Sequence, residues 1–545
     1  LHQMAQQRPS RMAIAEPLGR DRDGKRQYRQ ITFRELDVDS TLVAEALLER
    51  GAQPGMRVAL LVPQGIDFIS LVFAMFKAGL TVILIDPGMG RASMIGCLEE
   101  ARPEGFIAIS PAQAVRTVLR HRFPLARLNV TVGRRWFWGG STLRQLRSRP
   151  FTNHQMASAG GEDPAAIIFT TGSTGPPKGV LYRHGNFTQQ AEQIQQRYGI
   201  APGEIDLPGF PLFALFNCAM GVSTVIPDMD PTRPAEADPE KIIEAIDDWN
   251  VTQAFGSPAL WNVVGLYCER HERQLPTVRR VLSAGAPVPP HVLRRMKQAI
   301  HSDGDVFTPY GATEALPVAS IAASEVLKDT AEQTALGHGT CVGTPFSGIQ
   351  WKVIAISDAP LSDVTEATEL PPGEIGELIV RGPVVTTGYV TSSHANALHK
   401  IPDGGGFWHR MGDVGYLDRT GRFWFCGRAS HRVVTAHGTL FTVMCEAVFN
   451  QHPAVYRSAL VGIGPPGQQT PLLIVEPWPD RRPGSTKAKQ QLIAELKQIA
   501  QRHAHTRSIQ HVEIHRSLPV DIRHNAKIFR EKLAIRAAKR YTGRR

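Results

Sequence analysis

Continuous apolar runs alternate with helix-length segments near the start of the chain. Residues 58–62 are apolar throughout, and residues 80–85 are apolar except for Thr81; both runs have the length of strands. Residues 66–77 between them form a mostly apolar segment of helix length. Strand, helix, strand with continuous rather than alternating apolar runs is typical of a parallel sheet that is covered on both faces. The pattern therefore predicts a large α/β first part built of layered α/β/α sheets.

The residues before this unit carry the signals of a helix start. Thr32 can cap a helix, Glu35 follows three residues later as in a capping box, and Val43 and Leu47 continue the apolar face at helical spacing. Gly51 is expected to end the helix. The sequence therefore predicts a helix ahead of the first strand.

A smaller unit is predicted at the C-terminal end. Strands are expected at residues 459–463 and 472–475, and a helix at residues 492–500 with Leu496 and Ile499 on one face. Strands followed by a separate helix are typical of an α+β lobe.

A loop rich in glycine and hydroxyl side chains follows the apolar run at residues 165–169. Glycine lets the backbone approach an anion, hydroxyls donate hydrogen bonds, and Lys178 supplies a positive charge behind a stiff pair of prolines. A surface loop is the plainer alternative. A Walker A loop is disfavoured because Pro177 and Gly179, rather than Gly and Ser or Thr, flank the lysine. We interpret the loop as a phosphate-binding loop.

Composition narrows the class of protein. The chain has 545 residues and a formal net charge of +11. Such a charge is typical of proteins that bind nucleic acid, an anionic membrane surface or anionic substrates. No RNA-stacking motif, helix-turn-helix or zinc-finger spacing accompanies the charge, so we expect no nucleic acid partner and an ordinary basic surface that suits a nucleotide.

The six cysteines form no CxxC pair, which predicts reduced core residues in a cytoplasmic protein. The apolar tract at residues 66–85 is interrupted by charges and glycine, so we expect no membrane span.

The stretch at residues 167–180 resembles the AMP-binding signature of the adenylate-forming superfamily, which includes acyl-CoA synthetases, luciferases and adenylation domains. Later tracts match the superfamily's motifs in order. The resemblance implies a binding site for ATP and AMP made of Thr170, Thr171, Gly172, Ser173, Thr174, Gly175, Lys178, Gly285, Ala286, Pro287, Tyr310, Gly311, Thr313, Asp413 and Arg428. In that site Tyr310 would stack on the purine, Thr313 would meet the α-phosphate, and Asp413 with Arg428 would hold the ribose.

The same resemblance implies ATP and Mg²⁺ as the cofactors, with Glu314 as the magnesium ligand. The catalytic residues would be Lys527, Glu314, Thr313 and Lys178. It also implies two domains, an AMP-binding domain over residues 1–428 and a mobile C-terminal domain over residues 429–545, joined by a hinge at Ser430.

Residues 210–217 are dense in aromatic side chains and bear on which group receives the acyl chain. A core strand is one reading, and the superfamily's acyl pocket, with Phe213, Ala214 and Phe216, is the other. Ala214 stands where many coenzyme A ligases have histidine, and Ser430 stands where Asp or Lys is usual. With the tract at residues 226–234, the chain is most similar to the β-lactone synthetases of bacterial long-chain olefin biosynthesis.

That resemblance implies adenylation of a 2-alkyl-3-hydroxy long-chain fatty acid, followed by attack of the 3-hydroxyl to give a β-lactone, AMP and pyrophosphate. Association with other enzymes of the olefin pathway is implied as well. Two alternatives stay open: a long-chain acyl-CoA or acyl-AMP ligase that forms a thioester, and a non-catalytic nucleotide-binding protein.

Overall fold

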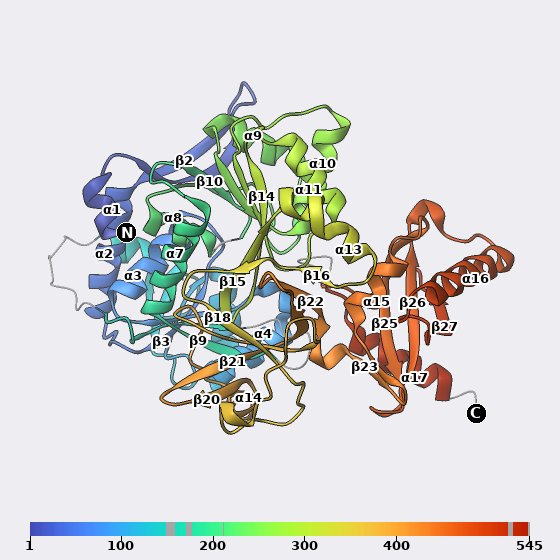
Figure 1. Ribbon diagram of the computed structural model, residues 1–545. Helices are drawn as coiled ribbons and strands as arrows, with labels where there is room; N and C mark the ends of the chain where they lie inside the picture. The colour runs from blue at the N-terminus through green and yellow to red at the C-terminus, as the bar shows by residue number, and fades with distance from the viewer. Residues whose placement is uncertain (149–158, 170–176, 211, 522–526, 543–545) are drawn as a thin grey trace.

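The structure is a computed structural model that describes residues 1–148, 159–169, 177–210, 212–521 and 527–542 (Figure 1). The chain forms two large sheets, a six-stranded sheet and a small C-terminal lobe. The predicted α/β first part and α+β end are confirmed by this arrangement.

A seven-stranded sheet is built from the N-terminal part of the chain. Its order is β7-β6-β5-β3-β4-β8-β9, and all neighbours except β8 and β9 are parallel. Its strands are β3 (Arg57–Leu61), β4 (Thr81–Leu84), β5 (Gly105–Ile109), β6 (Leu128–Val132), β7 (Ser141–Thr142), β8 (Pro164–Phe169) and β9 (Gly179–Arg183). The helices of this part are α1 (His2–Gln7), α2 (Phe33–Leu48), α3 (Ile66–Lys77), α4 (Arg91–Ala101), α5 (Ser110–Val118), α6 (Leu143–Arg147) and α7 (His184–Tyr198).

Local sequence signals decide several of these elements. The predicted capping box is confirmed, because the Thr32 side chain accepts from the Glu35 backbone N–H and the Glu35 carboxylate accepts from the Thr32 N–H. The predicted helix at residues 66–77 is confirmed as α3. Its apolar residues pack with those of α2, so the two helices cover one side of the sheet.

A nine-stranded sheet follows, in the order β17-β15-β14-β13-β12-β10-β11-β1-β2. Its strands are β1 (Met12–Arg20), β2 (Arg26–Thr32), β10 (Ile205–Pro208), β11 (Ser223–Val225), β12 (Gln253–Gly256), β13 (Arg280–Ser283), β14 (Asp305–Ala312), β15 (Ala315–Ala322) and β17 (Thr344–Pro345). The helices are α8 (Phe213–Met220), α9 (Pro239–Trp249), α10 (Pro258–Arg270), α11 (Pro290–Ala299), α12 (Ala323–Glu325) and α13 (Ala331–Ala335). Strands β10 to β14 are parallel, so the loops after their carboxyl ends gather at one edge.

The six-stranded sheet is antiparallel. It contains β16 (Thr340–Cys341), β18 (Gln350–Ile354), β19 (Gly376–Arg381), β20 (Lys400–Asp403), β21 (Gly406–Leu417) and β22 (Phe423–Arg428), with α14 (Ser393–His399) ahead of β20. Isolated bridges from Val180 to Tyr389 and from Ala315 to Val385 tie the segment after β19 to both large sheets. The three sheets therefore meet around this segment.

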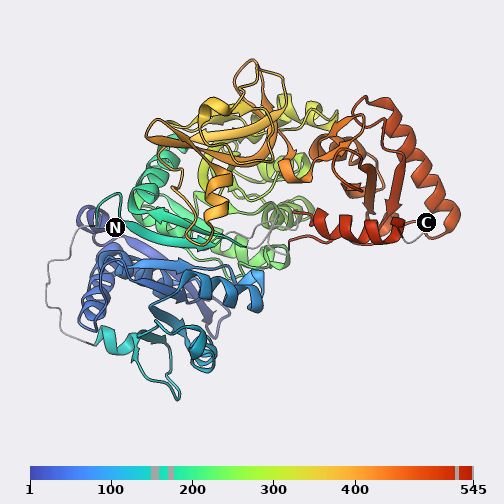
Figure 2. The ribbon, with the colours of Figure 1, turned by 90° about the horizontal axis from the view of Figure 1, so that it is seen from below.

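The C-terminal lobe lies to one side of the larger part (Figure 2). It contains the hairpin β23 (Val433–Thr435) and β24 (Gly438–Leu440), the sheet β25 (Val455–Ile463), β26 (Thr470–Pro477) and β27 (His511–Ile514), and the helices α15 (Thr442–Phe449), α16 (Thr486–Arg502) and α17 (Arg530–Thr542). Two apolar clusters of the lobe draw only on residues 433–537. The boundary between residues 428 and 429 remains a prediction.

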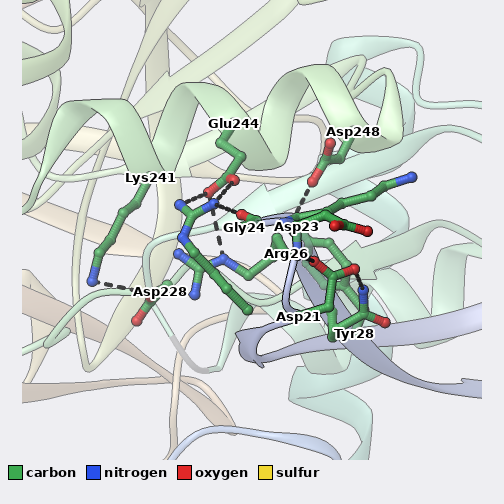
Figure 3. Close-up of polar contacts among 12 residues, drawn as sticks. Asp21, Asp23, Gly24, Arg26, Tyr28, Asp228, Lys241, Glu244 and Asp248 are labelled. Carbon is green, nitrogen blue, oxygen red and sulfur yellow. Dashed lines mark hydrogen bonds and ion pairs between the residues drawn. The ribbon is translucent and has the colours of Figure 1, made fainter.

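An ion network fixes the tract that follows β11 (Figure 3). Buried Arg26 of β2 lies 2.9 Å from the Asp228 carboxylate and 3.4 Å from Glu244 of α9, and it donates to the Leu18 carbonyl. Lys241 lies 3.1 Å from the same Asp228 carboxylate. The hairpin β1–β2, the tract and α9 are thereby joined at the carboxyl edge of the nine-stranded sheet.

Candidate active site

The predicted ribose site is assembled from three strands of two sheets. Asp413 of β21 and Arg428 of β22 are register partners, and Arg428 Nη1 lies 2.7 Å from Asp413 Oδ1. The Tyr310 hydroxyl at the end of β14 donates to Asp413 Oδ2. Burial and the Asp413 charge raise the pKa of Tyr310 far above its usual value, so the phenol stays a donor. The structure thus brings together three residues that the motifs had placed at the nucleotide.

The loop that carries the predicted nucleotide-binding residues Gly285, Ala286 and Pro287 lies next to this group along the sheet edge. Strand β13 ends at Ser283, and Gly285, Ala286 and Pro287 follow with Gly285 at φ +97°, a conformation that a residue with a side chain rarely adopts. Because β13 and β14 are parallel neighbours, this loop and Tyr310 emerge at the same edge. Gly311 also requires glycine, since a Cβ there would lie 2.6 Å from the Ala315 carbonyl oxygen.

Thr313 and Glu314 form the turn between β14 and β15. The Glu314 carboxylate accepts a hydrogen bond of 2.7 Å from the Tyr389 hydroxyl. The Glu314 carbonyl accepts from the backbone N–H of Thr386 at 2.9 Å. The Thr313 carbonyl accepts from the Tyr182 hydroxyl. Side chains from the seven-stranded sheet and from the segment after β19 therefore hold this turn from two sides.

Lys178 directly precedes β9 and lies near this turn. Its Nζ lies 3.3 Å from His399 Nε2 and 5.3 Å from the centre of the Tyr389 ring. Burial lowers the pKa of Lys178, and the nearby Glu314 charge opposes that shift. A cation, a carboxylate and a phenol are thus gathered where three sheets meet.

The rest of the predicted phosphate loop lies outside the described residues. Thr170, Thr171, Gly172, Ser173, Thr174 and Gly175 fall there, between the described ends of β8 and β9. Their assignment stays a prediction. Strands β8 and β9 are antiparallel neighbours, so the two ends of the loop are held side by side.

Aromatic rings line the sheet edge from α7 to β12. Phe187 lies 6.4 Å from Phe216, Phe216 lies 5.8 Å from Phe213, and Phe213 stacks on Phe255 at 4.3 Å between ring centres. The core-strand reading of residues 210–217 is wrong, because residues 213–220 form α8; a short apolar run alone does not separate the two. Ala214 is fully buried in the core shared with α2 and α3. The acyl-pocket role of Phe213, Ala214 and Phe216 stays a prediction.

The remaining predicted residues lie at or beyond the end of β22. Ser430 is exposed in a short 3-10 helix, Ala429–His431, directly after Arg428. Lys527 is exposed on the C-terminal lobe, where its carbonyl accepts from the Asp521 backbone N–H at 2.9 Å. Both roles, hinge and catalysis, stay predictions.

Four residues at this site escaped sequence reasoning: Tyr182, Tyr389, His399 and Lys400. Burial and the Lys178 charge lower the pKa of His399 to about 4, and burial lowers the pKa of Lys400 to about 7. The Lys400 ammonium donates to the Thr386 carbonyl. The sequence does show His399 and Lys400 side by side where a strand begins, and this was the signal available for a site. Their contact partners lie far away in the sequence, so the contacts themselves could not be predicted.

A family model described as AMP-binding enzyme matches residues 1–390. The chain is 45% identical to the olefin beta-lactone synthetase of Xanthomonas campestris, over 99% of this chain and 96% of that protein. It is 46% identical to the olefin beta-lactone synthetase of Stenotrophomonas maltophilia, over 99% and 97% of the two chains.

Solved structures share the fold. The anthranilate CoA ligase AuaEII in complex with anthranoyl-AMP superposes with a TM-score of 0.79 at 20% identity, over 99% of this chain and 97% of that one. The amide bond synthetase McbA of Marinactinospora thermotolerans superposes with a TM-score of 0.77 at 21% identity, over 96% and 97%. Within the described residues, no helix is long and apolar enough to cross a membrane.

Proposed function

Because the chain belongs to the AMP-binding enzyme family, we propose that it adenylates a 2-alkyl-3-hydroxy long-chain fatty acid with ATP and closes the product to a β-lactone. The observation that carries this proposal is the near full-length similarity, at 45% and 46% identity, to two olefin beta-lactone synthetases. The protein is an AMP-forming adenylate ligase. We further propose that it works in the cytoplasm, in association with other enzymes of olefin biosynthesis.

In the first step a carboxylate oxygen of the acid attacks the α-phosphorus of ATP, and the bond to pyrophosphate breaks. Negative charge builds on the phosphoryl oxygens, so positioned cations and donors lower the barrier. Lys178 would meet the leaving pyrophosphate, and the Thr313 hydroxyl would meet the α-phosphate. Asp413, already bound by Tyr310 and Arg428, would accept from the ribose hydroxyls.

Glu314 fits a magnesium ion that arrives with ATP. Magnesium is usually held by one or two carboxylates together with substrate phosphates and water. Within the described part of the chain, no three His, Cys, Asp or Glu side chains are grouped to hold a metal, so the other ligands at Glu314 would be phosphate oxygens and water. Bound there, the ion would neutralise phosphate charge. The Tyr389 hydroxyl orients the Glu314 carboxylate through its 2.7 Å hydrogen bond.

In the second step the 3-hydroxyl oxygen attacks the acyl carbonyl carbon, and the bond to AMP breaks. The hydroxyl proton passes to solvent, AMP leaves, and a four-membered lactone remains. A tethered nucleophile gains effective concentration, which offsets part of the ring strain. Ala214 in place of histidine and Ser430 at the hinge support an acceptor other than coenzyme A.

Pyrophosphate release without coenzyme A tests the proposal. A 2-alkyl-3-hydroxy fatty acid should give many turnovers with ATP and magnesium. The matched acid without the 3-hydroxyl should stop at no more than one acyl-AMP per enzyme, because it has no internal nucleophile. Equal turnover of both acids, or no release with the hydroxy acid, would contradict it.

A further inference from the structure

The loop between β6 and β7 carries two exposed aromatic rings on a buried one. The side chains of Trp136 and Phe137 are 52% and 72% exposed, whereas Trp138 is 6% exposed. Their rings lie 5.4 Å and 5.1 Å from the Trp138 ring, and Trp138 Nε1 donates to Thr131 Oγ1 at 2.9 Å. Trp138 therefore anchors the loop and holds Trp136 and Phe137 outward. We refer to residues 134–138 as the aromatic tip.

Exposed apolar side chains concentrate in this part of the chain. Of the eleven large hydrophobic residues recorded as exposed among the described residues, five lie between residues 115 and 137: Val115, Val118, Leu125, Trp136 and Phe137. Val115 and Val118 lie three residues apart on α5 and so share one face of that helix. The Ser110 hydroxyl, at the start of α5, donates to the Arg134 carbonyl, which ties this helix to the aromatic tip.

The same part of the chain is strongly basic. Residues 105–161 contain nine arginines and no Asp, Glu or Lys, so this segment alone carries +9 of the formal net charge of +11. Arg122 and Arg147 pair with carboxylates elsewhere. Arg134 and Arg135 are exposed at the aromatic tip, and within the described ranges no ion pair is recorded for either. Arg135 donates to the Gly140 carbonyl, which closes the loop.

We propose that the aromatic tip docks the enzyme on an anionic lipid bilayer. Indole and phenyl rings partition into the interface between water and lipid, and arginines pair with lipid phosphates. Two rings and two arginines on one anchored loop, with apolar side chains on the adjoining α5, suit such a surface. A single-stranded nucleic acid would use the charge and could stack on the two rings, but it would leave the exposed aliphatic side chains of α5 without an apolar partner, whereas a bilayer takes up both.

Vesicle sedimentation with the full-length protein tests the proposal. Vesicles of phosphatidylcholine containing phosphatidylglycerol should bind the protein, vesicles of phosphatidylcholine alone should bind it much less, and added salt should weaken the binding. Two changes address the tip: W136S with F137S, and R134Q with R135Q. The expected losses are more than tenfold for the aromatic pair and roughly thirtyfold for the arginine pair.

Matched controls are exposed residues far from the tip in sequence. L18S with W478S removes two exposed apolar side chains, and R22Q with R419Q removes two exposed arginines. Both controls should bind vesicles like the unchanged protein. Quenching of tryptophan emission by brominated lipids gives a second readout that needs no substitution, since Trp136 should lie in the interface.

Several results would overturn the proposal. One is equal binding to anionic and neutral vesicles, and another is unchanged binding by folded tip variants. A third is an absence of lipid quenching. Loss of a dimer on changing the aromatic pair, or capture of a single-stranded oligonucleotide through the tip, in the absence of vesicle binding, would assign the tip to a different partner.

Discussion

His399 lies against Lys178, with 3.3 Å between Nε2 of the imidazole and Nζ of the lysine. Burial, with the Lys178 charge, lowers the pKa of His399 to about 4, so the ring is neutral at pH 7 and one nitrogen can accept from the ammonium. The Tyr389 ring lies 5.3 Å from the same ammonium. His399 and Tyr389 together hold the Lys178 ammonium in place, and we propose that it meets the leaving pyrophosphate there.

The first prediction concerns this contact. His399→Ala should lower kcat/KM for ATP roughly tenfold, since a hydrogen bond to a charged group is worth about 1.5–3 kcal/mol. His399→Gln keeps an acceptor and should recover most of that loss. Steady-state pyrophosphate release at varied ATP measures both. Equal values for the two variants at equal thermal stability would argue that His399 only fills space.

The second prediction concerns Lys527. Lys527→Ala should lose roughly a hundredfold or more in adenylation, because a cation that meets the transferring phosphoryl group supplies several kcal/mol. Lys539→Ala is the control, since Lys539 is also exposed in the C-terminal lobe. Pyrophosphate release at a nearly unchanged rate in Lys527→Ala would remove this lysine from the mechanism.

The third prediction is a change in stability. Thr32→Ala should lower the free energy of unfolding by about 1 kcal/mol, because the capping box loses its side-chain acceptor. Thr188→Ala is the control: its hydroxyl donates to the His184 carbonyl inside α7, and its loss should change stability by less than about 0.5 kcal/mol. Chemical denaturation measures both.

The fourth prediction concerns Lys400 and pH. Burial lowers the pKa of Lys400 to about 7 in the folded protein, against 10.5 in the unfolded chain. Between those values the unfolded chain binds more protons, so this group makes stability rise with pH from about 7 upward. In Lys400→Met the rise between pH 7 and pH 9 should be shallower. Denaturant unfolding at several pH values measures the slope, and parallel curves would contradict the burial argument.

Local elements and linear motifs were predictable from the sequence, and long-range contacts were not. The bounds of α3 and the Thr32 capping box depend on neighbouring residues, so a few positions determine them. Asp413 and Arg428 were placed together by motif resemblance, and in the structure the two side chains are hydrogen-bonded, while their role at the ribose stays a prediction. Contacts of His399 with Lys178 and of Tyr389 with Glu314 span 221 and 75 residues, so only the folded sheets bring them together.

The same limit explains why the core-strand reading of residues 210–217 is wrong. Residues 213–220 form a helix because α8 packs its apolar face against two cores, which a short apolar run does not disclose.

Product analysis by proton NMR distinguishes ring closure from thioester formation in a single experiment. The enzyme is incubated with ATP, magnesium and a synthetic 2-alkyl-3-hydroxy fatty acid, with and without coenzyme A. A β-lactone should form in both reactions, at equal yield and with AMP and pyrophosphate as co-products. A thioester that forms only with coenzyme A, and no lactone in either reaction, would contradict it.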